Sequence, residues 1–302
     1  MLSSWNDTEN KKAIIDFVEK VSKEGTDFVP VAERIAVFDN DGTLWTENPS
    51  FIEALFSFDR MKEMIAKDPS LKEQQPFKAF IEKDMKAIHE LGMKGIADFV
   101  FKTHAAATQD EFNGIASDWF DKAAHPYYKH PVTQCIYQPQ HELLDYLRAN
   151  GFKTFIVTGG GIEFVRTIAE IIYGIPPEQV IGSSGKTAFD IQDKNVDVKR
   201  IEELRSFDDR EEKVVNISLH IGRRPIFVFG NSDGDLRMMQ YALSGKRPSI
   251  ALLLHHDDAG REIAYDKDFK LSPLNEALTV AKEWNIHVVS MKKDWNKVFA
   301  FE

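Results

Sequence analysis

The chain has 302 residues, of which 43% are hydrophobic and 28% charged, so it is long enough for a large core domain with an insert and too apolar for a disordered protein. Its 38 basic and 48 acidic residues give a formal net charge of −10, and no extended basic patch interrupts this excess. Nucleic acids and anionic membranes would repel such a protein, so we expect neither as a partner.

The single cysteine, Cys135, excludes an intrachain disulfide and leaves the redox compartment open. The first twelve residues lack the basic segment and apolar run of a signal peptide, and no run approaches the roughly 18 apolar residues of a membrane span. These features favour a cytoplasmic protein, and a periplasmic or secreted one stays open if a leader has been removed. The oligomeric state is not indicated.

The first predicted elements are a helix and a short buried strand. Apolar residues at helical spacing predict a helix over 11–22. The apolar run 35–38 then predicts a buried strand, and Gly42, directly after Asp41, signals a turn. Asp39 and Asp41 therefore leave the C-terminal end of a buried strand two residues apart.

Between about 49 and 134 the pattern becomes helical and contains no convincing strand. Two capping boxes, Ser50 with Glu53 and Thr108 with Glu111, precede runs with apolar residues on one helical face. This segment is predicted to be a helical cap domain inserted into another domain.

The remainder, 1–48 and 135–302, forms the predicted core, in which helices and strands alternate. After residue 135 we expect helices over 140–149, over 162–172, over the charged stretch 197–220 and from about residue 235 onward. Strands are expected over 154–157, 180–181, 226–229 and 250–254. This alternation predicts an α/β fold, a doubly wound parallel sheet with a Rossmann-like core.

The loop after the first strand contains the first candidate chemistry. The carboxylates of Asp39 and Asp41 would repel each other unless a cation lies between them or one is protonated. Mg²⁺ prefers oxygen ligands and suits phosphate chemistry. The structural alternative is an Asp- and Gly-rich turn that only caps the strand.

Two later loops also follow apolar strands. Thr158 and the three glycines after it offer a hydroxyl and backbone N–H groups at a helix N-terminus, which favours phosphate, although tight connections share this pattern. The loop 231–235 could complete a metal site or simply cap the next helix. Lys213, upstream of Asn231, could neutralise phosphate, and Lys199 is its competitor.

Other polar and aromatic residues are weaker candidates. The run His255-His256-Asp257-Asp258 could suggest a second metal site, but neighbouring side chains diverge, and a polar rim near the site is the simpler interpretation. Trp45 and Phe51 could line a cleft, although aromatic residues at this spacing more often belong to a core. Cys135 is interpreted as structural.

Taken together and in this order, four segments resemble the haloacid dehalogenase-like hydrolase superfamily, in particular its phosphatase branch. The segments are D-x-D-G-T-L as Asp39-Asn40-Asp41-Gly42-Thr43-Leu44; Thr158-Gly159-Gly160, similar to the Ser-Gly-Gly of phosphoserine phosphatases; a lysine, placed at Lys213; and Gly230-Asn231-Ser232-Asp233-Gly234-Asp235, which resembles G-D-x-x-x-D. The resemblance covers roughly 34–48 and 137–255, and the insert corresponds to the family's cap.

The resemblance implies a Mg²⁺-dependent phosphomonoester hydrolase. Asp39 would be the nucleophile and form an aspartyl-phosphate, and Asp41 would protonate the leaving oxygen and then activate water. Thr158, the Gly159 N–H and Lys213 would hold the phosphoryl oxygens.

The implied metal ligands are Asp39, the backbone carbonyl of Asp41, Asn231 and Asp235. Asn231 departs from the family, which usually has a metal-binding Asp there, and an amide brings no charge. Either the metal affinity is weaker, or Asp233 or Asp235 supplies the charge; Asp233 is the reserve ligand.

Several alternatives stay open at this stage. A dehalogenase has no use for an acid such as Asp41, because halide leaves without a proton. A phosphotransferase would need the same residues and a different acceptor, and Asn231 weakly favours a catalytically weak phosphate-binding module. The partner is expected to be a small phosphate ester whose identity the sequence does not reveal.

Overall fold

The fold is known from a computed structural model that describes residues 2–104 and 108–302. Its central feature is a seven-stranded sheet of order β4-β3-β2-β1-β5-β6-β7. The strands are β1 (Ile35–Phe38), β2 (Lys153–Gly161), β3 (Val180–Gln192), β4 (Asn195–Ser206), β5 (Phe227–Gly230), β6 (Ile250–His255) and β7 (His287–Ser290). Every neighbouring pair is parallel except β3 and β4. The predicted doubly wound α/β core is therefore confirmed.

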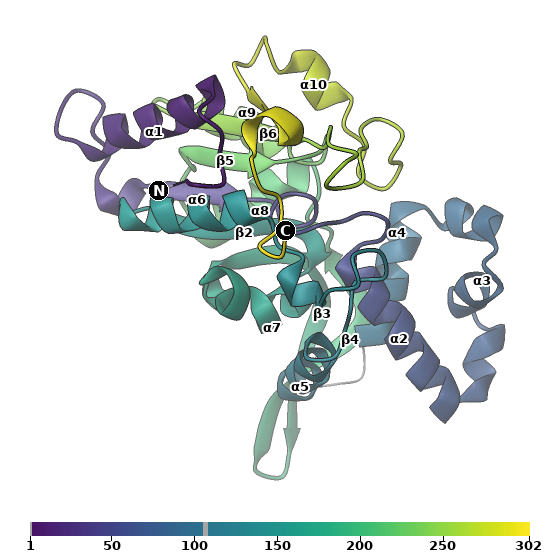
Figure 1. The fold of residues 1–302 in the computed structure, drawn as a ribbon. Coiled ribbons are helices and arrows are strands. Elements are labelled where there is room, and N and C mark those ends of the chain that lie inside the picture. The colour runs from purple at the N-terminus through teal and green to yellow at the C-terminus, as the bar shows by residue number, and fades with distance from the viewer. Residues whose placement is uncertain (1, 105–107) are drawn as a thin grey trace.

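Helices cover both faces of this sheet (Figure 1). The first face carries α1 (Glu9–Ser22), α6 (Gln138–Ala149) and α7 (Ile162–Tyr173), and the second carries α8 (Glu211–Ile221), α9 (Leu236–Leu243) and α10 (Glu276–Val280). A short helix, α11 (Met291–Asp294), follows β7. Ala36 and Phe38 of β1 pack with the first group, and Ile35 and Val37 with the second. The strand is apolar throughout because both of its faces are buried.

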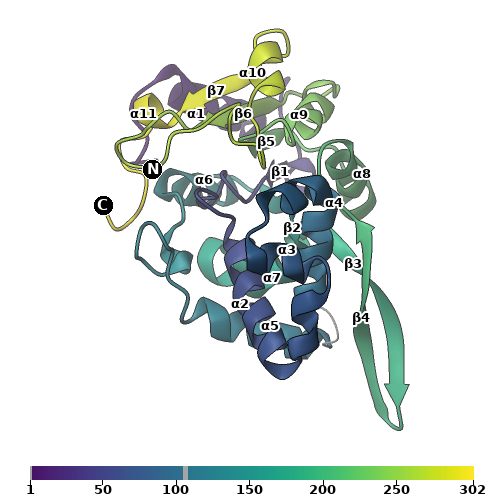
Figure 2. The ribbon, with the colours of Figure 1, turned by 90° about the vertical axis from the view of Figure 1, so that its right-hand side faces the viewer.

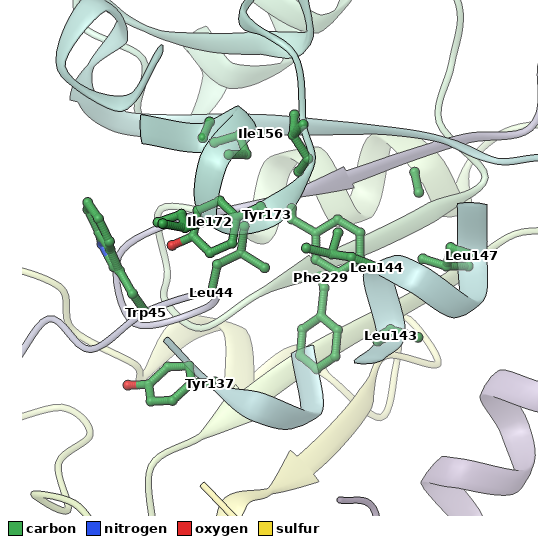
Figure 3. Packing of buried hydrophobic residues seen from close by; sticks show 14 of the residues in the cluster. Leu44, Trp45, Tyr137, Leu143, Leu144, Leu147, Ile156, Ile172, Tyr173 and Phe229 are labelled. Carbon is green, nitrogen blue, oxygen red and sulfur yellow. The ribbon is translucent and has the colours of Figure 1, made fainter. Parts of the chain in front are cut away.

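The segment directly after the Asp39 loop is anchored in the larger core. Leu44 and Trp45 are each 1% exposed and lie with Tyr137 and Tyr173 in one apolar cluster (Figure 3). The rings of Trp45 and Tyr173 lie 6.4 Å apart. This packing fixes both ends of the loop that contains the two aspartates, since β1 holds the other end.

The described residues of the insert form helices and no strand. They are α2 (Ile52–Lys67), α3 (Phe77–Glu82), α4 (Met85–His104) and α5 (Gln109–Phe120), whereas 105–107 lie outside the described residues. The capping box of Thr108 and Glu111 is confirmed. That of Ser50 and Glu53 is wrong: the residue before α2 is Phe51, without a side-chain cap, and the Glu53 carboxylate instead reaches Gly161 in the core. No helix in the described ranges is long and apolar enough to cross a membrane.

The insert shares part of its packing with the core. Phe164 of α7 contacts Phe56 of α2 and Phe120 of α5, with ring centroids 5.1 and 4.8 Å apart. Farther out, α2, α3 and α4 enclose a small separate cluster of Met61, Phe77 and Phe99 (Figure 2). The inner part of the insert therefore rests on α7, and its outer part has its own core.

The stretch 197–220, predicted to be one charged helix, contains two elements. Its first part belongs to β4, which pairs antiparallel with β3, and α8 begins only at Glu211. The hairpin of β3 and β4 extends away from the rest of the molecule in both views (Figures 1 and 2). Apolar residues face one another across it, Phe189 opposite Val198 and Ile191 opposite Val196. This two-residue alternation is the strand signal that the many charges obscured.

Candidate active site

The end of β2 and the loops that follow β1 and β5 meet at one edge of the sheet, because these three strands are parallel neighbours. Residues 158–161, predicted as a loop, form the last part of β2. They border a cavity of about 270 Å³ between the core and the insert. Five of the predicted site residues line it: Asp39, Asp41, Thr158, Gly159 and Lys213. The insert contributes Phe51, Glu53 and residues of α4 to the same wall. Asn231 and Asp235 are buried directly beside these residues.

Lys213 is the cation at the centre of the site. Its Nζ lies 2.7 Å from Asp39 Oδ1, 2.7 Å from Asp235 Oδ1 and 2.9 Å from the Val157 carbonyl. Burial alone would lower the pKa of this lysine, but Asp235 and Asp39 outweigh burial and raise its pKa above the ordinary value. The competing Lys199 lies on the hairpin, 2.7 Å from Asp190.

Asp39 and Asp41 experience different surroundings. Burial raises the pKa of Asp39, Asp235 raises it further, and Lys213 acts in the opposite direction. Burial raises the pKa of Asp41 to about 6, and the Trp45 indole N–H, which donates to its Oδ1 at 2.8 Å, limits that rise. A carboxyl group with this pKa is partly protonated near neutral pH, as general acid–base chemistry requires.

The glycines at the C-terminal end of β2 connect the core to the insert. The Thr158 Oγ1 accepts a hydrogen bond from the Gly160 N–H at 3.0 Å, which fixes its rotamer. The Gly161 N–H donates to Glu53 Oε2 at 2.8 Å. A Cβ on Gly161 would lie 2.4 Å from Glu53 Oε1, so glycine permits this close approach.

The loop after β5 is held by its own side chains. Asp235 Oδ2 accepts hydrogen bonds from the N–H groups of Asn231 (2.9 Å) and Ser232 (3.0 Å), while its Oδ1 accepts from Lys213. Asp235 Oδ1, which among the described residues accepts only from Lys213, is the oxygen with a lone pair left for a metal. Asp233, the reserve ligand, instead accepts from the N–H groups of Asn275 and Ala277.

His256 contacts the backbone of the loop after β1. Its Nε2 lies 2.8 Å from the Gly42 carbonyl and its Nδ1 2.6 Å from Glu262 Oε2. Asp257 and Asp258 turn to other partners, Ser290 and Arg261 respectively. Within the described ranges, no three or more His, Cys, Asp and Glu side chains are grouped as a metal centre. Adjacent residues of this run diverge, as expected.

Two buried carboxylates at the cavity, Glu47 and Glu53, were not among the predicted site residues. Glu47 Oε1 accepts hydrogen bonds from Asn231 Nδ2 at 2.8 Å and from the Tyr265 hydroxyl at 2.7 Å. Burial raises the pKa of Glu47, and burial likewise raises the pKa of Glu53 to about 8. The available signals were weak: Glu47 follows the first loop within a few residues, and Glu53 lies between the apolar residues Ile52 and Ala54.

Among the described residues the side chains are not gathered into a ready metal centre, but the chemistry of the donors suits a hard divalent cation. Asp39, Asp41, Glu47 and Asp235 are carboxylates within one buried region, and Lys213 is the cation bonded to two of them. Burial penalises such an excess of negative charge, and oxygen-rich sites of this kind suit Mg²⁺. Together with the Asp41 carbonyl and the Asn231 amide, these residues present oxygen donors that Mg²⁺ accepts.

Comparison with known families identifies the chain. The family model described as haloacid dehalogenase-like hydrolase matches residues 36–240, more than half of the sequence. The chain belongs to this family. The match includes all three loops and Lys213, and it identifies the protein as a hydrolase of this family.

Solved structures agree with this fold at low sequence identity. A conserved functionally unknown protein from Anaerococcus prevotii DSM 20548 is 16% identical, covers 93% of this chain and 91% of its own, and gives a TM-score of 0.53. A protein with unknown function from Bordetella pertussis Tohama I is 15% identical, covers 85% and 98%, and gives 0.52. Both are similar to this chain in fold. A comparison with curated proteins finds no match.

Proposed function

We propose that the protein is a Mg²⁺-dependent phosphomonoester hydrolase that acts on a small phosphorylated molecule through an aspartyl-phosphate on Asp39. The observation that carries this proposal is the position of Lys213, which contacts Asp39 inside the cavity that Asp41 and Thr158 also line. This arrangement combines a nucleophile, an acid and a cation around a space for one phosphoryl group.

In the first step an Asp39 carboxylate oxygen attacks phosphorus, and the bond from phosphorus to the leaving oxygen breaks. Asp41 gives its proton to that oxygen, so the alcohol leaves neutral. Thr158, the Gly159 N–H and Lys213 would orient the phosphoryl oxygens and stabilise their charge.

In the second step Asp41, now deprotonated, accepts a proton from water. The water oxygen attacks phosphorus, the bond to the Asp39 oxygen breaks, and inorganic phosphate leaves. Asp41 is then protonated and Asp39 is free again, so the cycle closes without a further reactant.

Mg²⁺ would be held by Asp39, the Asp41 carbonyl and Asn231, with Asp235 as the fourth predicted ligand, and when bound it would neutralise phosphoryl charge. The cavity of about 270 Å³ supports a small substrate. Its wall includes Phe51 and Glu53 from the insert, which are therefore candidates for contact with the part of the substrate beyond the phosphate.

The test is turnover of an aryl phosphate by the full chain with Mg²⁺ and with a chelator. We expect activity only with the metal, and a loss of several orders of magnitude in Asp39→Asn, which keeps the shape but removes the attacking charge. Mass spectrometry or a metal fluoride should trap the intermediate on Asp39. Full activity in chelator, or phosphate on another residue, would contradict the proposal.

A phosphotransferase remains the second candidate because it uses the same residues. Adding an alcohol during turnover separates the two functions. A hydrolase releases inorganic phosphate at an unchanged rate, whereas a phosphotransferase forms a new phosphate ester in proportion to the alcohol concentration.

A further inference from the structure

Glu47 is a carboxylate of the cavity wall that has no part in the steps above. Glu47 is 1% exposed and lines the cavity that also holds Asp39 and Asp41. Its Oε1 accepts from Asn231 Nδ2 at 2.8 Å and from the Tyr265 hydroxyl at 2.7 Å. Both donors are neutral groups, and a buried carboxylate held by neutral donors is costly unless a cation lies nearby.

The hydrogen bonds fix how the Asn231 amide lies. A carboxylate accepts hydrogen bonds, so the amide N–H group faces Glu47 and the amide oxygen faces the other way. There the Thr43 Oγ1 donates to Asn231 Oδ1 at 2.9 Å, and the same hydroxyl lies 3.4 Å from Asp39 Oδ2. The Asn231 side chain therefore bridges the Thr43 hydroxyl, which lies beside Asp39, and the Glu47 carboxylate.

The loop backbone is shaped to permit this contact. Gly42 has φ of 72°, and a Cβ there would lie 2.1 Å from Asn231 Nδ2 and 2.5 Å from Glu47 Oε1. A side chain at position 42 would therefore separate the two residues. The pairing of Asn231 with Glu47 is consequently built into the loop that contains both catalytic aspartates.

We propose that Glu47 supplies the acidic charge of the cation site that Asn231 does not carry. The inference rests on the proposed function, because the cation concerned is the Mg²⁺ of that reaction. The family usually has an acid at position 231, and here an amide and a carboxylate in hydrogen-bonded contact carry the same total charge. The charge has moved to the partner of residue 231, and Glu47 is thereby a residue of the metal site.

The test measures Mg²⁺ binding by isothermal titration calorimetry on the full chain without substrate. Glu47→Gln keeps the size of the side chain and an oxygen that can accept the same two hydrogen bonds, but it removes the charge. We expect the dissociation constant to rise by about 10- to 100-fold, the range found when residues around a metal are changed. Glu53→Gln is the control for replacing a buried glutamate of the same cavity wall without removing a charge at neutral pH, because burial raises the pKa of Glu53 to about 8. Its constant should stay within about threefold of wild type.

A second variant tests whether the charge can be moved back. Glu47→Gln combined with Asn231→Asp should regain a dissociation constant within about threefold of wild type, because the pair again carries one charge. Thermal unfolding in chelator should show that both proteins are folded. Wild-type affinity in Glu47→Gln, or a double variant as weak as that single variant, would overturn the inference. A wild-type protein that binds no Mg²⁺ would instead contradict the proposed function.

Discussion

Among single residues, Asp39 and Asp41 are both buried but have different partners. Asp39 shares Lys213 with Asp235, so a positive charge lies beside the carboxylate that would attack phosphorus. Asp41 instead receives the Trp45 indole N–H, a neutral donor, and burial raises its pKa to about 6. A nucleophile and a general acid need carboxyl groups whose surroundings favour different protonation states, and Asp39 and Asp41 have such different surroundings.

This difference predicts how Asp41→Asn behaves. The variant keeps the nucleophile but has no proton to give, so esters with poor leaving groups should suffer most. We expect turnover of an alkyl phosphate to fall about 100-fold more than that of an aryl phosphate, because general acid catalysis contributes about 10²- to 10⁴-fold. Steady-state kinetics on both esters is the measurement, and equal losses would assign the proton to another group.

The sequence predicted which loops form the site better than which side chains complete it. Loops at the carboxyl ends of neighbouring parallel strands must meet, so the joint position of Asp39, Thr158 and Asn231 followed from the strand pattern. The contact of Glu47 with Asn231 depends on side-chain directions and on a glycine turn, and neither leaves a periodic signal.

At the scale of elements, Glu53 connects the first helix of the insert to the glycines at the C-terminal end of β2. A Cβ at position 161 would lie 2.4 Å from the Glu53 carboxylate, so Gly161→Ala should displace that side chain. We expect Gly161→Ala to lower the free energy of unfolding by about 1–2 kcal/mol in the wild-type background and to have little effect when Glu53 is Ala. Urea unfolding of the four proteins measures this coupling. Additive losses would show that the two residues act independently.

The inner helices of the insert depend on α7. Phe164 is fully buried and contacts both Phe56 and Phe120. Phe164→Ala should therefore lower the free energy of unfolding by about 3–5 kcal/mol, the usual cost of such a cavity. Phe189→Ala on the hairpin, where the side chain is 71% exposed, is the control and should change it by less than about 0.5 kcal/mol. A similar small effect for both would mean that the insert does not rest on Phe164.

Element types were predicted where apolar periodicity was strong and were missed where charge dominated. The strands near β1, β2, β5 and β6 are apolar because both sides are covered, and their positions were correct. The region 197–206 lies on a projecting hairpin where charged residues obscure the two-residue alternation of its apolar ones. The capping box at Ser50 failed for another reason: the Glu53 carboxylate is used by the core.

In the whole molecule, the formal charge of −10 includes several carboxylates that folding buries in one cavity. Each of these groups loses hydration on folding, and one lysine is bonded to two of them. The cavity therefore couples the stability of the entire fold to pH and to bound cations, since anything that removes negative charge there favours the native state.

Glu53 gives this coupling a measurable form. Burial raises its pKa from the ordinary 4.5 to about 8, so between these values the native state holds a proton that the unfolded state has lost. Its contribution to stability is complete below pH 4.5 and disappears as the pH rises through 8, with a slope of up to about 1.4 kcal/mol per pH unit. Glu53→Gln cannot ionise and should abolish this part of the pH dependence.

The measurement is the free energy of unfolding of wild type and Glu53→Gln, from urea titrations at pH 5, 6.5 and 8 in chelator. We expect the free energy of unfolding of the variant to increase relative to that of wild type at each step in pH. The reason is that only in wild type does the unfolded state lose a proton from residue 53 that the folded state retains. The other buried carboxylates are common to both proteins, so their contributions cancel in the difference. Parallel pH profiles would show that Glu53 is ionised in the folded state throughout this range, and that its bond to Gly161 is formed by a carboxylate rather than by a neutral acid.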